Sequence, residues 1–246
     1  RFGVQHKEKI KRYRSEVDVM TLSATPIPRT LYMSLMGIRD LSLIVSPPAD
    51  RLAVRTRIIQ TNDFIIQEAV SREIRRGGQI FIVHNRVETI YEYGNYLRGI
   101  LPSAKIAIAH GQLGEHQLER VMVDFIEGNT EVLLTTTIIE SGLDIPRANT
   151  ILINNADSFG LSQLYQLRGR VGRSNVQAFA YLLVPAEKIL NGVAQERLQV
   201  LQELNDLGAG FKVASRDLEI RGAGNLLGSE QSGQIASVGL ELYTQM

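Results

Sequence analysis

The chain has 246 residues, of which 44% are hydrophobic and 22% are charged, and 27 Lys and Arg against 26 Asp and Glu leave a net charge of +1. This composition is typical of a globular protein with a sizeable core and excludes wholesale disorder. The balanced charge excludes a uniformly basic coat for nucleic acid but is compatible with a local basic patch. Cysteine is absent, which excludes disulfide frameworks, thiolate metal sites and cysteine nucleophiles.

No apolar run approaches the roughly 20 residues that a membrane span needs, so we expect no membrane partner. The lack of cysteine fits a reducing compartment, and we expect a cytoplasmic location. The chain opens on RFGVQHKEK, without an initiator Met or the apolar core of a signal peptide. We therefore expect it to be a piece of a longer protein.

Short apolar runs alternate with stretches of helical periodicity along the chain. Glu115–Glu127 is the clearest helix, with apolar residues at helical spacing, and Gly128 is a typical stop signal. Runs that are apolar on both faces, separated by amphipathic helices, predict an α/β fold whose mostly parallel sheet is covered on both sides. The predicted strands are Val17–Leu22, Gln79–Val83, Lys105–Ala109, Glu131–Thr135, Thr150–Ile153 and Ala178–Val184.

Two breaks divide this pattern. Pro47 and Pro48 form the single Pro-Pro pair, after a strand-like run over Leu41–Val45, and suit a stiff linker. The strand signal ends after Pro185. A helical pattern over Gln195–Leu207 follows, and then a glycine-rich tail from residue 208 to residue 239.

The segment QLRGRVGR, residues 166–173, places three arginines within six residues and spaces them with glycines. Arginine makes bidentate, planar contacts with phosphate, and glycine lets the backbone approach a ligand closely. The pattern indicates arginine fingers that stabilise charge on a transferring γ-phosphoryl group. The alternative is a basic helix end that only caps backbone carbonyls.

Two hydroxyl-rich segments follow predicted strands. In TTTIIESGLDIP, residues 135–146, hydroxyls and amides follow a strand end and could bind a sugar-phosphate backbone. Gly142 permits close approach of the ligand, and Asp144 could accept a hydrogen bond from a ribose hydroxyl. In TLSATPIP, residues 21–28, a turn leads into a helix that proline opens. The alternatives are a satisfied turn in the first segment and simple N-capping by Thr25 in the second.

Several common motifs are missing from the sequence. No G-x-x-x-x-G-K-[ST] occurs, so the chain has no P-loop lysine, and no acidic pair follows a strand to hold Mg²⁺. His6, His84, His110 and His116 lack metal-ligand spacing, and we predict no metal site in this chain.

Together these segments resemble the carboxyl-terminal half of a superfamily 2 DNA helicase or translocase motor. TLSATPIPRTL is similar to motif III of that superfamily, QIFIVHNR to the motif IV region and AHG to motif IVa. TTTIIESGLDIP is similar to motif V, and QLRGRVGR to motif VI. The likeness covers essentially the whole chain in order.

The carboxyl-terminal tail indicates which members of this superfamily the chain resembles most. RDLEIRGAGNLLG, residues 216–228, followed by QSG at 231–233, resembles the TRG motif. That motif is shared by RecG-type branch-migrating helicases and the bacterial transcription-repair coupling factors. The segments LGAGF and VGLELY, and Ala223 where RecG-type proteins usually carry proline, resemble the coupling factors more closely.

The resemblance implies two RecA-like domains that grip ATP and double-stranded DNA between them. Residues 1–45 would end the first domain, 46–190 would form the second, and 191–246 would form the helical hairpin and loop of the TRG motif. It also implies ATP-driven translocation on double-stranded DNA, with RNA polymerase and excision-repair proteins as partners. ATP and Mg²⁺ would be bound by the parent protein, whose Walker A and Walker B elements would precede Arg1, so the isolated chain is expected to lack ATPase activity.

Motif position also assigns roles to residues. Arg170 and Arg173 would be the catalytic fingers, and the nucleotide-binding residues would be Gly142, Asp144 and Gln166. The DNA-binding residues would be Arg86, His110, Gly111 and Thr136. The residues that couple the ATP state to DNA movement would be Ser23, Thr25, Arg221 and Gln231, with Arg197 a weaker candidate.

Two other functions are compatible with the same residues. One is a RecG-type motor that acts on forked DNA. The other, of a different class, is a non-enzymatic α/β module that binds nucleic acid or protein.

Overall fold

The computed structural model describes residues 42, 44, 51–137, 145–187, 189–204, 206 and 208–221. These residues contain one six-stranded sheet in the order β1-β6-β5-β2-β4-β3, and all its strand pairs are parallel. The predicted α/β class is confirmed. The strands are β1 (Arg55–Gln60), β2 (Gln79–Val83), β3 (Ile106–Ala109), β4 (Val132–Thr135), β5 (Ala148–Ile153) and β6 (Phe179–Val184).

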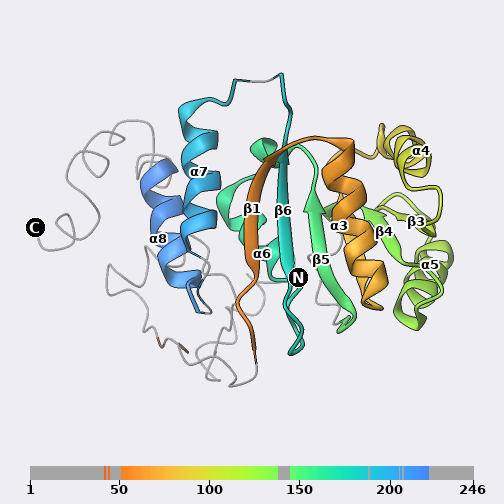
Figure 1. The fold of residues 1–246 in the computed structure, drawn as a ribbon. Helices are drawn as coiled ribbons and strands as arrows, with labels where there is room; N and C mark the ends of the chain where they lie inside the picture. Colours follow the sequence, from red (N-terminus) through yellow and green to blue (C-terminus); the bar gives the residue numbers. More distant parts are fainter. Residues whose placement is uncertain are drawn as a thin grey trace, which may run out of the picture.

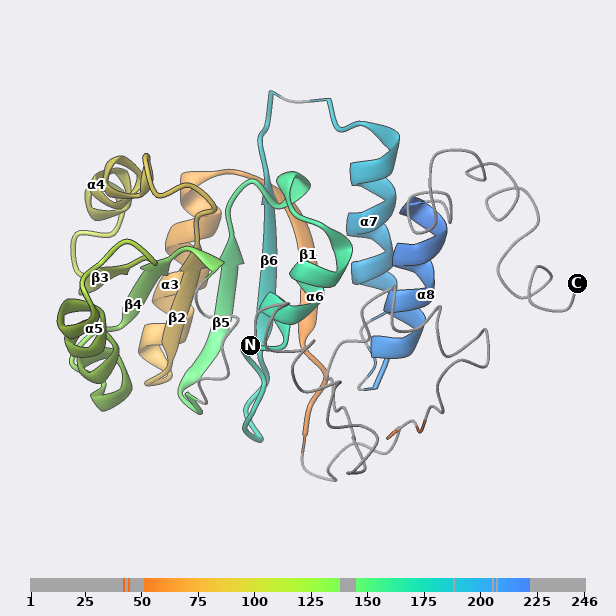
Figure 2. The same cartoon turned by 180° about the vertical axis from the view of Figure 1, so that it is seen from behind.

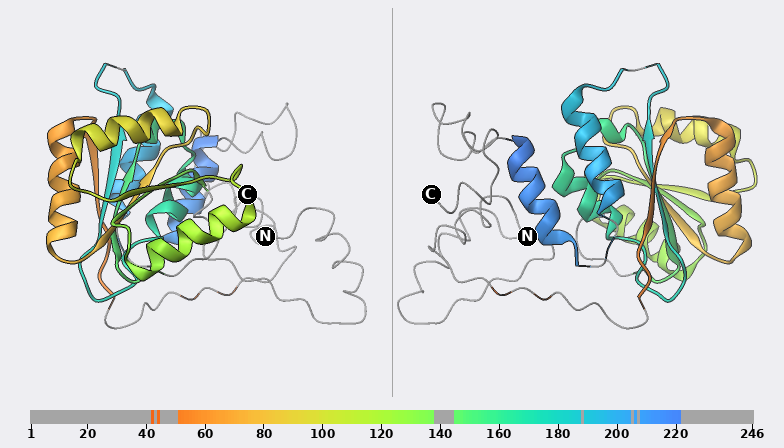
Figure 3. Two further views of the ribbon diagram at one scale, coloured as in Figure 1. Left: turned by 90° about the vertical axis from the view of Figure 1, so that its right-hand side faces the viewer. Right: turned by 60° about the vertical axis from the view of Figure 1, so that its left-hand side comes forward.

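Helices cover both faces of the sheet (Figures 1 and 2). One face carries α3 (Asp63–Arg75) and α4 (Ile90–Ile100). The opposite face carries α5 (Glu115–Glu127), the short 3-10 helix η3 (Ala156–Ser158), α6 (Leu161–Arg168) and α7 (Gly192–Glu203). Helix α8 (Gly210–Arg221) packs against α6 and α7, and Figure 3 shows the two helix layers with the sheet between them.

The middle of the sheet is apolar on both faces. All five residues of β2 are buried; Ile80 and Ile82 face α3 and α4, whereas Phe81 and Val83 face α5 and α6. Burying one such side chain contributes about 1.5–3 kcal/mol, so this strand is anchored on both sides. The sheet therefore forms a rigid support for whatever follows the ends of its strands.

Most of the predicted elements are confirmed. Of the predicted strands, β2 has its expected bounds, and four others shift by two residues or fewer. The predicted strand Val17–Leu22 lies outside the described residues. Helix α5 also has its predicted bounds, and Gly128 ends it in the left-handed region with φ 85°, where its amide donates to Asp124 and Phe125. No helix among the described residues is long and apolar enough to cross a bilayer.

Three elements differ from the predictions. Strand β1, with the sequence RTRIIQ, is not predicted by the sequence pattern, because this edge strand has only two apolar residues and they do not alternate with polar ones. Helix α7 begins at Gly192, where the Asn191 side chain caps it, and ends at Glu203 rather than at Leu207. The periodicity of the glycine-rich tail predicts no helix, whereas the tail opens with helix α8, in the region where the resemblance implied the hairpin. The division of the chain into domains stays a prediction.

Candidate functional site

Polar side chains follow four neighbouring strands at the carboxyl edge of the sheet. His84 follows β2, His110 follows β3, Thr136 follows β4 and Asn154 follows β5. All four are 7% exposed or less. Because buried polar groups must find partners, this edge is held together by side-chain hydrogen bonds.

His84 is the centre of these bonds. Its Nδ1 lies 3.0 Å from Asn154 Nδ2, its Nε2 lies 2.7 Å from Thr89 Oγ1, and its ring stacks on Tyr93 at 4.8 Å. An amide nitrogen can only donate, so Nδ1 accepts and Nε2–H donates to Thr89. Burial, and then the charge of Arg86, lower the pKa of His84. The imidazole is therefore held in its neutral form.

His110 has one satisfied nitrogen and one without a partner. Its Nε2 lies 2.9 Å from the hydroxyl of Tyr91, whose ring meets the imidazole edge to face. Its Nδ1 is buried and finds no partner among the described residues. Gly111 is exposed in the turn that follows, and the Thr136 amide donates to Ala109 O at 3.3 Å.

Arg86 adds the positive charge at this edge. It is exposed in the turn between β2 and α4. The carboxyl edge therefore gathers the four residues that were predicted to bind DNA, namely Arg86, His110, Gly111 and Thr136. Their contact with DNA stays a prediction.

The arginine turn, residues 166–173, lies at the opposite edge. Helix α6 starts beyond the carboxyl end of β5 and runs back along the sheet, so the turn after it meets the amino ends of the strands. There Arg51 Nε donates to Gly172 O at 2.9 Å, and Ser174 Oγ donates to Asn149 Oδ1 at 3.1 Å. A strand of six residues spans about 20 Å, which separates the two edges.

Backbone carbonyls hold Arg170 and Arg173. The Nε of each donates to the carbonyl four residues earlier, Gln166 O and Gly169 O, at 3.4 Å, and both side chains are half-buried. Gly172 has φ 74°, and a Cβ there would lie 2.8 Å from a methyl carbon of Val54. The turn therefore needs glycine at this position to pack against the sheet. Guanidinium donors of this kind can bind phosphate groups, and the contact of Arg170 and Arg173 with a nucleotide stays a prediction.

Arg168 has a different task from the other two arginines. It is 5% exposed, its Nη1 donates to Leu201 O and Leu204 O at 2.9 Å each, and its guanidinium stacks on Tyr165. Burial lowers the pKa of Arg168, and Tyr165 partly opposes that shift. A cation at the carboxyl end of α7 also complements the helix dipole. Arg168 therefore caps carbonyls at the end of another helix, α7, whereas Arg170 and Arg173 donate to carbonyls of their own segment.

A second contact ties α6 to α8, where Ser162 Oγ donates to the fully buried Asp217. No sequence pattern predicts this pair, because the two residues are 55 positions apart in the chain. Gln166 is half-buried in α6, Arg197 is half-buried in α7, and Arg221 ends α8. The remaining predicted residues lie outside the described residues: Ser23, Thr25, Gly142, Asp144 and Gln231.

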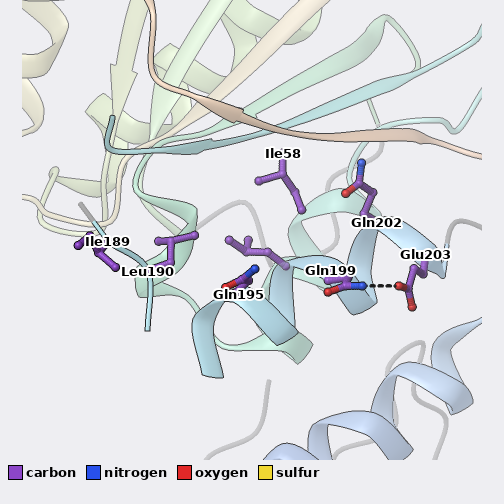
Figure 4. Close-up of a pocket in the computed structure, with 8 residues that line it drawn as sticks. Ile58, Ile189, Leu190, Gln195, Gln199, Gln202 and Glu203 are labelled. Carbon is purple, nitrogen blue, oxygen red and sulfur yellow. Dashed lines mark hydrogen bonds between the residues drawn. The ribbon is translucent and has the colours of Figure 1, made fainter. Parts of the chain in front are cut away.

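A hollow of about 600 Å³ lies between β1 and α7 (Figure 4). Ile58 and Leu198 line it, together with glutamine side chains of α7, and Gln199 donates to Glu203 beside it. No predicted site residue contributes to this hollow. Among the described residues, no group of three or more His, Asp or Glu side chains could hold a metal ion.

Comparison with known proteins agrees with this arrangement. Residues 60–175 match the family described as the helicase conserved C-terminal domain. The chain is 57% identical over its whole length to the transcription-repair-coupling factor of Myxococcus xanthus, and 55% identical to that of Bacillus subtilis. It spans 20% and 21% of those proteins, or about a fifth of each.

One solved structure is also similar over most of the chain. RecG bound to a three-way DNA junction is 37% identical and superposes with a TM-score of 0.72, over 92% of this chain and 30% of that one. This likeness confirms the RecA-like α/β fold and the helical hairpin behind it.

Proposed function

We propose that this chain, which is 55–57% identical to transcription-repair-coupling factors and spans about a fifth of their length, forms the second motor domain and the coupling hairpin of an ATP-driven translocase on double-stranded DNA. In the parent protein, acting in the cytoplasm, this motor displaces stalled RNA polymerase during transcription-coupled repair and works with excision-repair proteins. The main support for this proposal is that the arginine turn and the polar residues of the carboxyl edge lie at opposite ends of one sheet. A motor needs separate sites for nucleotide and DNA.

At the amino edge, Arg170 and Arg173 would bind the phosphates of ATP, and bound Mg²⁺ would neutralise part of the phosphate charge. Backbone carbonyls fix the Nε atoms of both side chains, so little reorganisation is needed when charge develops on the phosphoryl oxygens. Their main effect should therefore be on turnover rather than on nucleotide affinity. Gln166, and the Gly142 and Asp144 segment, would complete the nucleotide contacts.

At the carboxyl edge, Arg86 would pair with a DNA phosphate, and His110, Gly111 and Thr136 would hydrogen bond to the backbone. Neutral donors and a single arginine supply little counterion release, so binding should be weak and independent of base sequence. Such contacts suit a motor, because it must release and rebind the duplex at every step.

Helix α6 connects the two sites. It begins near the carboxyl edge and ends at the arginine turn, while Arg168 holds α7 and Ser162 holds α8. A shift of the arginine turn on ATP hydrolysis would therefore move the α7–α8 hairpin with it. Arg221 and Gln231, with Ser23 and Thr25, would pass that movement to DNA.

Triplex displacement tests the proposal in the parent protein. A translocase that follows linear duplex should displace a third strand in an ATP-dependent manner without separating the duplex strands. ATP hydrolysis without displacement would contradict translocation on duplex DNA.

A RecG-type motor is the second candidate, favoured by the similarity to RecG bound to a three-way DNA junction. Such a motor should unwind a three-way junction much faster than it displaces a triplex on linear duplex. The opposite order supports the coupling-factor activity.

A further inference from the structure

Five exposed arginines form a patch that neither edge site uses. Arg55 and Arg57 lie on β1, and Arg72, Arg75 and Arg76 lie at the carboxyl end of α3. We call this set the arginine patch. It lies on the face of the sheet that carries α3 and α4, toward the amino end of the strands.

The register of the sheet brings the two groups together. Arg55 pairs with Phe179 and Arg57 with Tyr181 across β1 and β6, so these side chains share one face. The guanidinium carbons of Arg72 and Arg76 lie 5.8 and 5.4 Å from the centroid of the Phe179 ring. Cation–π contact at these distances orders arginine side chains over the ring.

Carboxylates neutralise only part of the patch. Glu68 pairs with Arg72, and the buried Glu73 pairs with Arg76. Arg75 Nε donates to Ser71 O in its own helix, and the side chains of Arg55 and Arg57 have no partner among the described residues. Two carboxylates against five guanidinium groups leave three positive charges, in a chain whose total is +1.

Ordinary structural roles explain part of this set. Basic residues in the last turn of α3 complement the helix dipole, which accounts for Arg72 and Arg75. Charged residues on an edge strand discourage strand pairing, but lysine is the usual choice for that role and the patch contains none. Neither role requires Arg55 to lie beside the ring on which Arg72 and Arg76 stack.

The surface around the patch is accessible within the described part of the chain. Figure 1 shows α3 next to β5, with β6 and β1 following in the sheet and no described helix in front of these two strands. Phe179 is half-buried and offers an apolar contact beside the guanidinium groups of Arg72 and Arg76. Arginine and aromatic side chains with this arrangement are enriched at protein–protein interfaces.

We propose that the arginine patch binds an acidic polypeptide segment that presents several carboxylates. Each guanidinium can hold a carboxylate through two parallel hydrogen bonds, and Phe179 supplies an apolar contact. The duplex at the carboxyl edge is a poor candidate, because strand length places the patch about 20 Å from that edge. The proposal does not depend on translocation.

The test uses a fluorescein-labelled polyglutamate peptide and the full chain, with binding followed by fluorescence anisotropy at low salt. The double variant Arg55→Gln/Arg57→Gln removes two exposed charges that hold no described partner, so the fold should be unaffected. We expect it to raise the Kd by about tenfold, since the removed groups act as a cluster rather than as isolated surface pairs. Added salt should weaken the wild-type complex, because exposed charges are screened.

The matched control removes the same charge elsewhere. Arg98 and Arg120 are exposed on α4 and α5, and Arg98→Gln/Arg120→Gln should leave peptide binding within about twofold. Equal weakening by both double variants, or no binding of the peptide to the wild-type chain, would overturn the proposal. The proposal would also be overturned if the patch variant lost duplex DNA binding as strongly as peptide binding, because the surface would then contact nucleic acid.

Discussion

The two edges of the sheet hold their polar side chains by different means. At the carboxyl edge, neutral side chains bind one another: His84 with Asn154 and Thr89, and His110 with Tyr91. At the amino edge, arginines donate to backbone carbonyls of the chain itself. The first arrangement joins buried polar side chains to one another, and the second holds permanent charges against the main chain.

This difference matches the two proposed tasks. Stabilising a transferring phosphoryl group requires charges that do not move when the reaction proceeds, and backbone carbonyls are the most rigid anchors available. A contact that follows DNA must instead form and break at each step. The comparison predicts that substitutions at the amino edge should lower the rate of ATP turnover. Substitutions at the carboxyl edge should change the affinity for duplex DNA slightly.

The largest effect is expected at the amino edge. Arg170→Ala or Arg173→Ala in the parent protein should lower ATP turnover by at least about a hundredfold, because fingers of this kind contribute roughly 10³–10⁵ in related sites. Steady-state ATPase assays in the presence of duplex DNA measure this loss. Duplex binding should survive in both variants.

Arg98→Ala, on the exposed side of α4, is the control and should leave turnover unchanged. A rise in KM for ATP without a fall in kcat would contradict the role, since it would indicate uniform binding rather than transition-state stabilisation.

The next effect separates Arg168 from its two neighbours. Arg168→Met keeps the length of the side chain but removes the donors to Leu201 O and Leu204 O. Hydrogen bonds from charged groups are worth about 1.5–3 kcal/mol, so the free energy of unfolding should fall by about 2 kcal/mol. Urea denaturation measures this change. The exposed Arg98→Met variant should lose much less, and equal losses would show that Arg168 does not hold α7.

The sequence predicted those parts of the fold whose pattern is strong. Strands buried on both faces, such as Gln79–Val83, and the amphipathic helix Glu115–Glu127 have their expected bounds. Strand β1 was missed because an edge strand has less apolar surface to bury, and RTRIIQ resembles a loop in composition. The glycines on both sides of α8 interrupt its periodicity, so this helix was expected only from the resemblance to the TRG hairpin.

The site was predictable only in part, because spacing shows residue types but not partners. The motif pointed to three arginines, yet only contact with α7 distinguishes Arg168 from Arg170 and Arg173. Asn154 and Tyr91 carry no motif, and they became visible only when the sheet placed them beside His84 and His110. Long-range contacts of this kind leave no local pattern.

A smaller effect is expected from Tyr91 at the carboxyl edge. Tyr91→Phe removes the hydroxyl that orients His110, and a single hydrogen bond contributes about 0.5–1.5 kcal/mol. Duplex affinity should fall by about threefold in an anisotropy titration at fixed salt. Tyr96→Phe is the matched control, since its hydroxyl binds Asp63 instead. Tighter binding by Tyr91→Phe would show that Tyr91 shields His110 from DNA.

The smallest effect concerns the pH dependence of stability at His84. Burial and Arg86 lower the pKa of His84 in the folded chain below the ordinary value of 6.5. Between these two pKa values the unfolded chain binds more protons, so the free energy of unfolding should fall as the pH drops below about 6.5, by at most about 1.4 kcal/mol per pH unit.

Urea denaturation at several pH values should therefore show a shallower acid decline for His84→Gln than for the wild type. The amide of Gln does not titrate, and it can still accept from Asn154 and donate to Thr89. His116→Gln, at an exposed position of α5, should keep the wild-type slope. If His84→Gln and the wild type lost stability in parallel, the imidazole would not be held neutral at the carboxyl edge. The contrast between neutral buried side chains at the carboxyl edge and arginines at the amino edge would then fail at its best-defined residue.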